Sequence, residues 1–233
     1  MSVHLPIDFK ALVVGADGAL GQAFVRHLQQ DMGCAEVLRL SRSAGDGFDL
    51  RDPASLDRLG QRLTGTGPFH VIIDATGALT IDGVGPEKSL AKLDAAVLQQ
   101  TFAVNAIGPA LLLRHLTPLL ASGDAVYAKL SARVGSISDN RKGGWYGYRA
   151  SKAALNMLLQ TAAIELQRRN PRLRVVALQP GTVRSRLSQP FQAGVQELLD
   201  PEVSAAGMLR TMLALETKSG AHFVDYKGAS IPW

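Results

Sequence analysis

The stretch Lys10-Ala-Leu-Val-Val-Gly-Ala-Asp-Gly-Ala-Leu-Gly21 joins a short apolar run to three glycines with the spacing G-x-x-G-x-x-G. The apolar run predicts a buried strand, and the amphipathic residues 22–30 after the glycines predict a helix. At such a junction the first glycine allows a sharp turn, the second admits a pyrophosphate and the third lets helix and strand pack closely. A plain glycine-rich loop is the alternative. We favour a dinucleotide cradle, whose candidate contacts are Gly15, Asp17, Gly18, Ala19, Leu20 and Gly21.

The end of the second expected strand, residues 36–40, bears on the choice between the two nicotinamide dinucleotides. In a dinucleotide fold this strand end lies beside the adenosine ribose, where an acidic residue selects NAD by binding the 2′-hydroxyl. The chain has Ser41 and Arg42 there instead. A hydroxyl and a guanidinium suit a 2′-phosphate, so we expect NADP(H) to be favoured over NAD(H); an exposed, uncommitted arginine is the alternative. Asp49 is a candidate partner of the adenine amino group, or a turn residue.

Strand and helix patterns alternate along the rest of the chain. This alternation predicts an α/β fold, namely a Rossmann-like, doubly wound parallel β-sheet with helices on both faces in three layers, as a single domain over residues 1–233. The carboxyl ends of parallel strands meet at the cofactor, so the turn Ala75-Thr76-Gly77 is expected there. Further strands are expected at 70–74, 124–130, 173–178 and 223–226, and helices at 53–63, 88–120, 145–169, 189–199 and 201–215.

Composition excludes several other classes of protein. The 233 residues are 46% hydrophobic and 19% charged, which is ordinary for a globular domain and unlike a disordered chain. The single cysteine, Cys34, excludes an internal disulfide and makes the protein's expected compartment cytoplasmic. No membrane span is expected, because no uncharged apolar run approaches about 20 residues. The net charge of +5 is small and no aromatic residues interleave the basic cluster at 168–174, so no nucleic-acid partner is expected. No metal site is expected either.

Two side chains in the segment Trp-Tyr-Gly-Tyr-Arg-Ala-Ser-Lys, residues 145–152, carry the expected chemistry. Tyr148 and Lys152 stand four residues apart, so a helix places the phenol and the ammonium on one face. A free tyrosine titrates near pH ~10, and an adjacent cation would make it a usable proton donor at neutral pH. Tyr146 lacks such a partner, because Ala150 is at its i+4 position. The alternative is an amphipathic helix whose lysine reaches towards solvent.

Other polar positions precede this pair. Asn105 lies inside an apolar helical stretch, where a buried amide needs partners, either structural ones or a water that feeds a catalytic site. Ser131 and Ser136 follow the strand expected at 124–130. Hydroxyls at the C-terminal end of a strand face the crevice of a doubly wound sheet, so both serines are candidates for the site.

With these motifs in this order, the chain resembles the short-chain dehydrogenase/reductase family over nearly its full length. The segments Ser-Ile-Ser-Asp-Asn, Tyr-Arg-Ala-Ser-Lys and Ser-Ile-Pro-Trp look closest to the C-factor-like branch of the family. The resemblance implies hydride transfer between NADP(H) and a carbonyl or alcohol substrate, with Tyr148 as general acid/base. The matching pieces are Gly15-x-x-Gly18-x-x-Gly21, Ala75-x-Gly77, Asn105, Tyr148-x-x-x-Lys152 and Pro180-Gly181.

The same resemblance implies roles for other residues. Lys152 would bind the nicotinamide ribose and lower the pKa of Tyr148, and Asn105 would hold a water in the proton relay. The long helices would join subunits, so a homodimer or homotetramer is expected. Residues 188–200, with Phe191 and Val195, are expected to cover the substrate. The nicotinamide end of the cofactor would contact the turn that contains Pro180, Gly181, Thr182, Val183 and Ser185.

The chain departs from the family pattern in two places. The middle glycine of the triplet stands one position earlier than in the commonest form. More seriously, the family usually orients substrate with the second residue of a Ser-Ser pair, and that residue here is Ala132. Ser131 is the first candidate to replace it, and Ser136, whose separation from Tyr148 is nearer the usual one, is the second. This gap leaves an alternative function open: a dinucleotide-binding signalling or regulatory protein of the C-factor type, with weak or no reductase activity.

Overall fold

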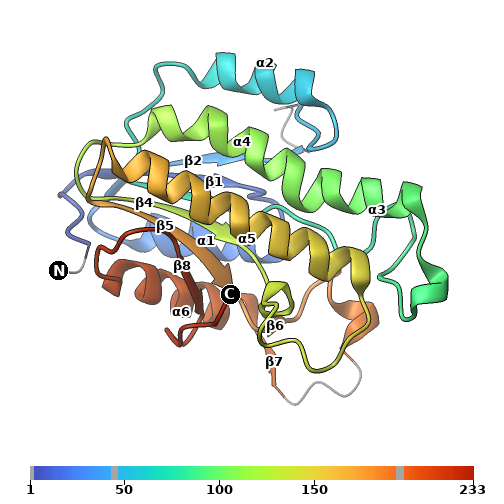
Figure 1. Ribbon diagram of the computed structural model, residues 1–233. Helices are drawn as coiled ribbons and strands as arrows, with labels where there is room; N and C mark the ends of the chain where they lie inside the picture. Colours follow the sequence, from blue (N-terminus) through green and yellow to red (C-terminus); the bar gives the residue numbers. More distant parts are fainter. Residues whose placement is uncertain (1–2, 43–46, 193–196) are drawn as a thin grey trace.

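The computed structural model describes residues 3–42, 47–192 and 197–233, and its centre is a parallel sheet (Figure 1). The strands of this sheet lie in the order β2-β1-β3-β4-β5-β8, and every neighbouring pair is parallel. The chain therefore reverses its direction of winding between β1 and β3, which confirms the doubly wound fold. The strands are β1 (Phe9–Val14), β2 (Cys34–Leu40), β3 (Val71–Asp74), β4 (Ala125–Leu130), β5 (Leu173–Gln179) and β8 (His222–Asp225).

Helices cover both faces of the sheet, as the alternation predicts. One face buries Phe24 of α1 and Met208 of α6, and the other buries Leu56 of α2, Leu112 of α4 and Leu155 of α5. A strand covered on both faces needs apolar residues at nearly every position, which explains the continuous apolar runs in the sequence. The covering helices are α1 (Ala19–Gln30), α2 (Pro53–Leu63), α4 (Gly108–Leu116), α5 (Tyr146–Gln167) and α6 (Pro201–Ala214).

The helical stretch expected at 88–120 is a chain of short segments. After a turn of 3₁₀-helix, η2 (Leu90–Lys92), the Asp94 side chain caps α3 (Ala95–Phe102) by accepting a hydrogen bond from the Val97 N–H at 3.0 Å. A π-helical turn, η3 (Ala103–Ile107), then joins α3 to α4, and η4 (Thr117–Leu119) follows. Within the described residues, 95–119 is the one helical run apolar and long enough to cross a membrane, but Leu112, Leu113, Leu116 and Leu119 pack into the core against the sheet.

The prediction of a helix at 189–199 is wrong. The structure has a 3₁₀ turn, η6 (Gln189–Phe191), and a short strand, β7 (Leu198–Leu199). Strand β7 pairs in parallel with β6 (Thr182–Val183), so contact with a distant segment, rather than local helix propensity, satisfies the backbone there. Val195, which we expected over the substrate, lies outside the described residues.

Candidate active site

The turn between β1 and α1 requires glycine because the backbone doubles back on itself. Gly15 has a φ of +77°, and a Cβ on Gly21 would lie 2.0 Å from the Gly15 carbonyl oxygen. Helix α1 begins after Gly18, and no side-chain hydrogen bond caps this end within the described part of the chain. The first N–H groups of α1, which start at Ala19 and Leu20, are therefore open to an anion. These features fit the pyrophosphate of a dinucleotide.

Polar residues next to this turn lie where the adenosine end is expected. The Ser41 hydroxyl donates a hydrogen bond to Asp17 at 2.7 Å, so Asp17 links the glycine turn to the end of β2. Arg42 follows with an exposed side chain. The Arg51 backbone N–H donates to Asp49 Oδ1 at 2.8 Å and the Arg51 guanidinium pairs with Asp49 Oδ2 at 3.3 Å, and these contacts lower the pKa of Asp49. Asp49 is thus held by Arg51 in the structure, and its contact with the adenine amino group stays a prediction.

A buried ion pair holds the turn after β3. Asp74 and Lys129 are direct partners in the register of β3 and β4, and both side chains are fully buried. The Lys129 ammonium donates to Asp74 Oδ1 at 3.1 Å and to the Thr76 carbonyl oxygen at 2.6 Å. Asp74 Oδ1 also accepts from the Thr76 backbone N–H at 2.9 Å and from the Thr76 hydroxyl at 2.6 Å. The pair therefore fixes the path of Ala75-Thr76-Gly77.

Sequence reasoning missed the Lys129–Asp74 pair. The available signal was one charged residue in each of two otherwise apolar, buried strands. Desolvation lowers the pKa of Lys129, and the opposing charge of Asp74 raises it. A buried charge needs a partner, so two such residues on neighbouring strands of a parallel sheet could have been matched.

Tyr148 and Lys152 share one face of α5 as predicted. The Lys152 ammonium lies 5.7 Å from the centre of the Tyr148 ring and donates to the Leu130 carbonyl oxygen at 3.2 Å. A Cβ placed on Gly77, whose φ is +140°, would lie 3.4 Å from the Lys152 Nζ. The glycine therefore lets the turn after β3 approach the lysine. The predicted Tyr–Lys pair thus lies beside the carboxyl ends of the strands, where the cofactor is expected.

The expected lowering of the Tyr148 pKa is wrong for this structure. Burial raises the pKa of the Tyr148 hydroxyl instead. Burial, followed by the charge of Lys129, lowers the pKa of Lys152 to about 7, while Asp74 opposes this shift. Desolvation disfavours the charged form of both groups.

The Asn105 side chain has two structural partners. Its amide donates to the Ala78 carbonyl oxygen at 2.8 Å and accepts from the Ala78 N–H at 3.0 Å. Asn105 lies in η3, where the wider π-helical turn disturbs the regular backbone ladder. Of the two alternatives left open by the sequence, the structural one describes the Asn105 amide, and its role in a proton relay stays a prediction.

The structure changes the order of the two candidate serines. Ser131 is buried, and its hydroxyl donates to the Asn156 Oδ1 at 2.6 Å, so the proton points into the core rather than to a substrate. Ser136 is also buried, but its hydroxyl accepts a hydrogen bond, from the Asp139 N–H at 3.1 Å. A hydroxyl that accepts one bond can still donate its proton, so Ser136 is now the better candidate.

The turn after β5 lies at the same edge of the sheet. Gly181 has a φ of +77°, and the Pro180 carbonyl oxygen accepts a hydrogen bond from the Ser204 hydroxyl of α6 at 2.7 Å. Thr182 and Val183 form β6, and the hydroxyls of Ser185 and Ser188 lie 3.2 Å apart. The residues expected at the nicotinamide end therefore lie in one turn, which hydrogen bonds from Ser204 and between Ser185 and Ser188 hold in place.

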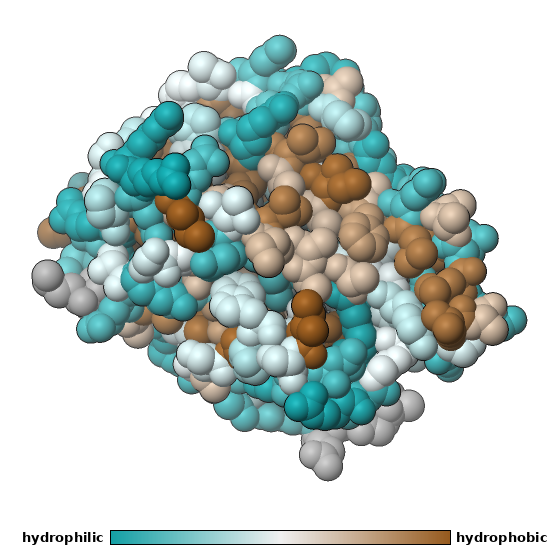
Figure 2. Space-filling model, in the orientation of Figure 1, coloured by the Kyte–Doolittle hydropathy of each residue, from teal (hydrophilic) through white to brown (hydrophobic). Residues whose placement is uncertain are grey.

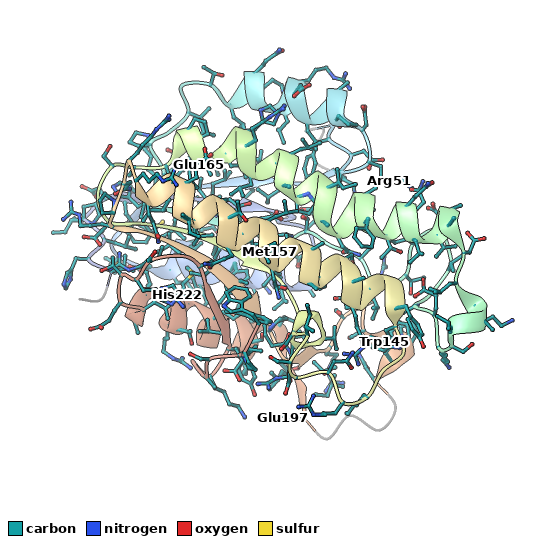
Figure 3. All side chains as sticks on the ribbon, in the orientation of Figure 1. Arg51, Trp145, Met157, Glu165, Glu197 and His222 are labelled. Atoms are coloured by element: carbon teal, nitrogen blue, oxygen red, sulfur yellow. The ribbon has the colours of Figure 1, made fainter. Side chains whose placement is uncertain are left out.

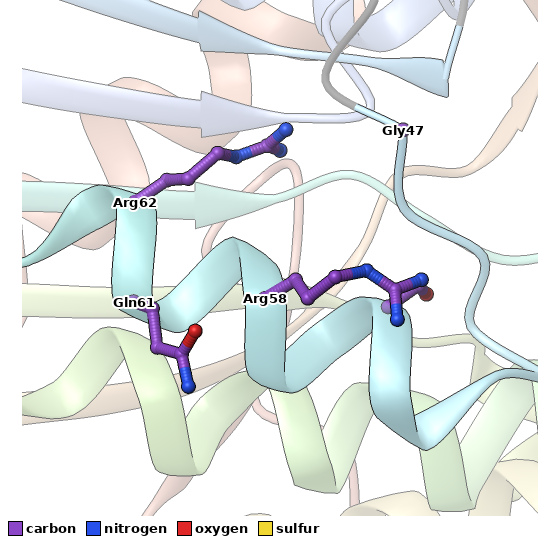
Figure 4. A pocket seen from close by; sticks show the side chains of 5 residues that line it. Gly47, Arg58, Gln61 and Arg62 are labelled. Atoms are coloured by element: carbon purple, nitrogen blue, oxygen red, sulfur yellow. The ribbon is translucent and has the colours of Figure 1, made fainter.

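A pocket of about 410 Å³ lies elsewhere, beside α2, and is drawn in Figure 4. It is lined by Gly47, Ser55, Arg58, Gln61 and Arg62, none of which the sequence analysis selected. Among the described residues, no group of three or more His, Cys, Asp or Glu side chains could hold a metal ion. The assignment of the candidate site therefore rests on the glycine turn and the Tyr148–Lys152 pair, and not on this pocket or on a metal.

The glycine turn on a doubly wound sheet places the chain among the dinucleotide-binding α/β proteins. A family model described as short chain dehydrogenase matches residues 10–196, so the chain belongs to this family of oxidoreductases. It is 29% identical to 1-hydroxy-2-glutathionyl-2-methyl-3-butene dehydrogenase of Rhodococcus sp. (strain AD45), covering 95% of this chain and 98% of that protein.

Two further comparisons are informative. The chain is 34% identical to the C-signal protein of Myxococcus xanthus over 72% of this chain and 95% of the relative, which agrees with the predicted C-factor resemblance. Its fold matches the NADPH-bound carbonyl reductase from chicken fatty liver with a TM-score of 0.76 and 22% identity, covering 98% and 100% of the two chains.

Proposed function

We propose that this protein is an NADP-dependent carbonyl reductase or alcohol dehydrogenase. The observation that carries the proposal is that Lys152 lies beside the Tyr148 ring and next to the Gly77 turn, at the carboxyl ends of the strands where the cofactor is expected. Bound NADPH supplies the hydride to the carbonyl carbon. Tyr148 donates its hydroxyl proton to the carbonyl oxygen, so that the substrate gains one hydride and one proton and becomes an alcohol.

The Tyr148 phenol is protonated at neutral pH, which is the form that donates, but burial raises its pKa and makes it a weaker acid than a free tyrosine. The proposed proton transfer therefore depends on a cation that stabilises the phenolate. Lys152 is fixed by the Leu130 carbonyl oxygen and faces the turn through the space left by Gly77. From there it would bind the nicotinamide ribose, and its protonated form would stabilise the phenolate left after proton transfer. Ser136, or Ser131 after a change of rotamer, would orient the substrate oxygen.

The experiment that tests the proposal is NADPH consumption by the wild-type protein on a panel of aldehydes and ketones. Turnover of any member supports the reductase. The relative C-signal, and alanine at position 132, favour the second candidate, a dinucleotide-binding signalling protein with weak or no activity. Tight NADPH binding without turnover on any carbonyl would replace the first function by the second.

Arg42→Ala is expected to remove the preference for NADPH over NADH. A charge-assisted hydrogen bond to a phosphate contributes about 1.5–3 kcal/mol, so NADPH affinity should fall roughly ten- to a hundredfold while NADH affinity changes little. Quenching of tryptophan emission measures both affinities. Arg114→Ala, which removes a positive charge from α4, is the matched control. Equal affinities for the two cofactors in the wild type would refute the role of Arg42.

The exposed face of α5 supports the expected homodimer or homotetramer. Met157, Leu158 and Ile164 are exposed on this helix, and apolar residues gather over it in Figure 2. An exposed apolar patch on a soluble enzyme commonly marks a protein–protein contact. We therefore propose that copies of the chain associate through this helix face.

A further inference from the structure

Trp145 has a backbone conformation that is rare for a bulky residue. It is the last of three consecutive residues in the left-handed region, with φ values of +60° at Gly143, +63° at Gly144 and +54° at Trp145. Glycine adopts this conformation readily, but a side chain with a Cβ does so at a cost in free energy. Such strained residues persist where surrounding contacts enforce them, and they cluster at functional sites.

Contacts from both sides enforce the turn. The Trp145 N–H donates to the Glu87 carbonyl oxygen at 2.5 Å, and the Glu87 carboxylate accepts from the Gly147 N–H at 2.9 Å. On the other side, the Arg149 guanidinium donates to the carbonyl oxygens of Gly143 and Gly144 at 3.2 Å and 2.9 Å. These contacts therefore fix the backbone of Trp145 at the start of α5, where Figure 3 labels the residue.

The indole lies between Tyr148 and a loop that is remote in sequence. Its centroid is 6.1 Å from that of the Tyr148 ring and 5.3 Å from that of Phe191, and both contacts are edge-on, with interplanar angles of 73° and 70°. Phe191 also lies against Gly85, where an added Cβ would be 3.5 Å from its ring. Trp145 and Phe191 thus form an aromatic wall beside the proposed proton donor.

We propose that Trp145 and Phe191 determine substrate specificity by selecting flat, aryl or conjugated carbonyl compounds. A flat ring can stack on the wall or meet it edge-on, and burial of its apolar surface adds to these contacts. A short aliphatic carbonyl compound gains much less from the same surface. This inference rests on the reductase function proposed above and names its substrate class.

The test compares 2-naphthaldehyde with butanal as substrates of the NADPH-loaded protein. Trp145→Gly removes the indole and suits the left-handed backbone, so the variant should fold. It is expected to lower the ratio of kcat/KM for naphthaldehyde to kcat/KM for butanal about tenfold. Trp145→Phe, which keeps an aromatic ring, should lower it less than threefold. Tyr146→Leu is the matched control, because Tyr146 is a neighbouring exposed aromatic residue outside the wall, and it should leave the ratio unchanged.

A binding measurement separates failure of this inference from failure of the proposed function. The chain has two tryptophans, so in a Trp233→Phe background the emission comes from Trp145 alone. With NADP⁺ bound, 2-naphthaldehyde should quench this emission and butanal should not. Quenching without turnover of any aldehyde would reject the reductase and keep the aromatic wall. Turnover with an unchanged ratio in Trp145→Gly, or no quenching, would reject the wall as the determinant of specificity.

Discussion

Tyr148→Phe should abolish most of the NADPH-dependent reduction of a carbonyl substrate. The substitution removes one hydroxyl, and with it the proton that the carbonyl oxygen receives. General acid catalysis by a positioned group contributes about 10²–10⁴-fold, so kcat should fall by that factor. Binding of NADPH should survive, because the glycine turn and Lys152 remain. Steady-state kinetics and a separate binding titration measure the two effects.

Tyr146→Phe is the control for this experiment. It removes the same atom from the same end of α5, but Tyr146 is exposed and has Ala150 rather than a lysine one turn later. Its turnover should equal that of the wild type. If Tyr148→Phe retained wild-type turnover, Tyr148 could not be the proton donor.

Local patterns in the sequence predict most of this fold. Strands β1, β3, β4 and β5 are buried and largely apolar, and amphipathic or apolar helices alternate with them along the chain, so that few arrangements other than a doubly wound sheet remain. The i, i+4 spacing of Tyr148 and Lys152 likewise predicts their shared face. In each case the information lies within a few residues of the feature that it determines.

Features that depend on distant contacts are missed. The pairing of β6 with β7 replaces the helix expected at 189–199. Asn156 accepts the hydrogen bond from the hydroxyl of Ser131, the first candidate serine, so this proton is not directed towards a substrate. The strained Trp145 depends on Glu87, which lies in a loop that sequence patterns left without a role. Each of these contacts joins segments whose proximity follows only from the folded chain.

Lys129→Met is expected to cause the largest loss of stability. It leaves the fully buried Asp74 carboxylate without its cation, and removing one member of a buried ion pair typically costs about 3–5 kcal/mol. Unfolding in urea, followed by circular dichroism, measures the loss. Lys10→Met is the matched control, because the Lys10–Glu36 pair at 2.7 Å is exposed to solvent and should contribute less than about 1 kcal/mol.

A second substitution identifies the charge as the cause. Asp74→Asn in the Lys129→Met background removes the unpaired charge, while the amide oxygen can still accept the hydrogen bond from the Thr76 N–H. At least half of the lost stability should return, and the coupling free energy follows from the double-mutant cycle. NADPH affinity should fall in Lys129→Met beyond any effect of Lys10→Met, because the pair fixes the turn that lies beside Lys152. If Lys129→Met lost no more stability and no more NADPH affinity than Lys10→Met, the charge of the Lys129–Asp74 pair would not be what holds this turn.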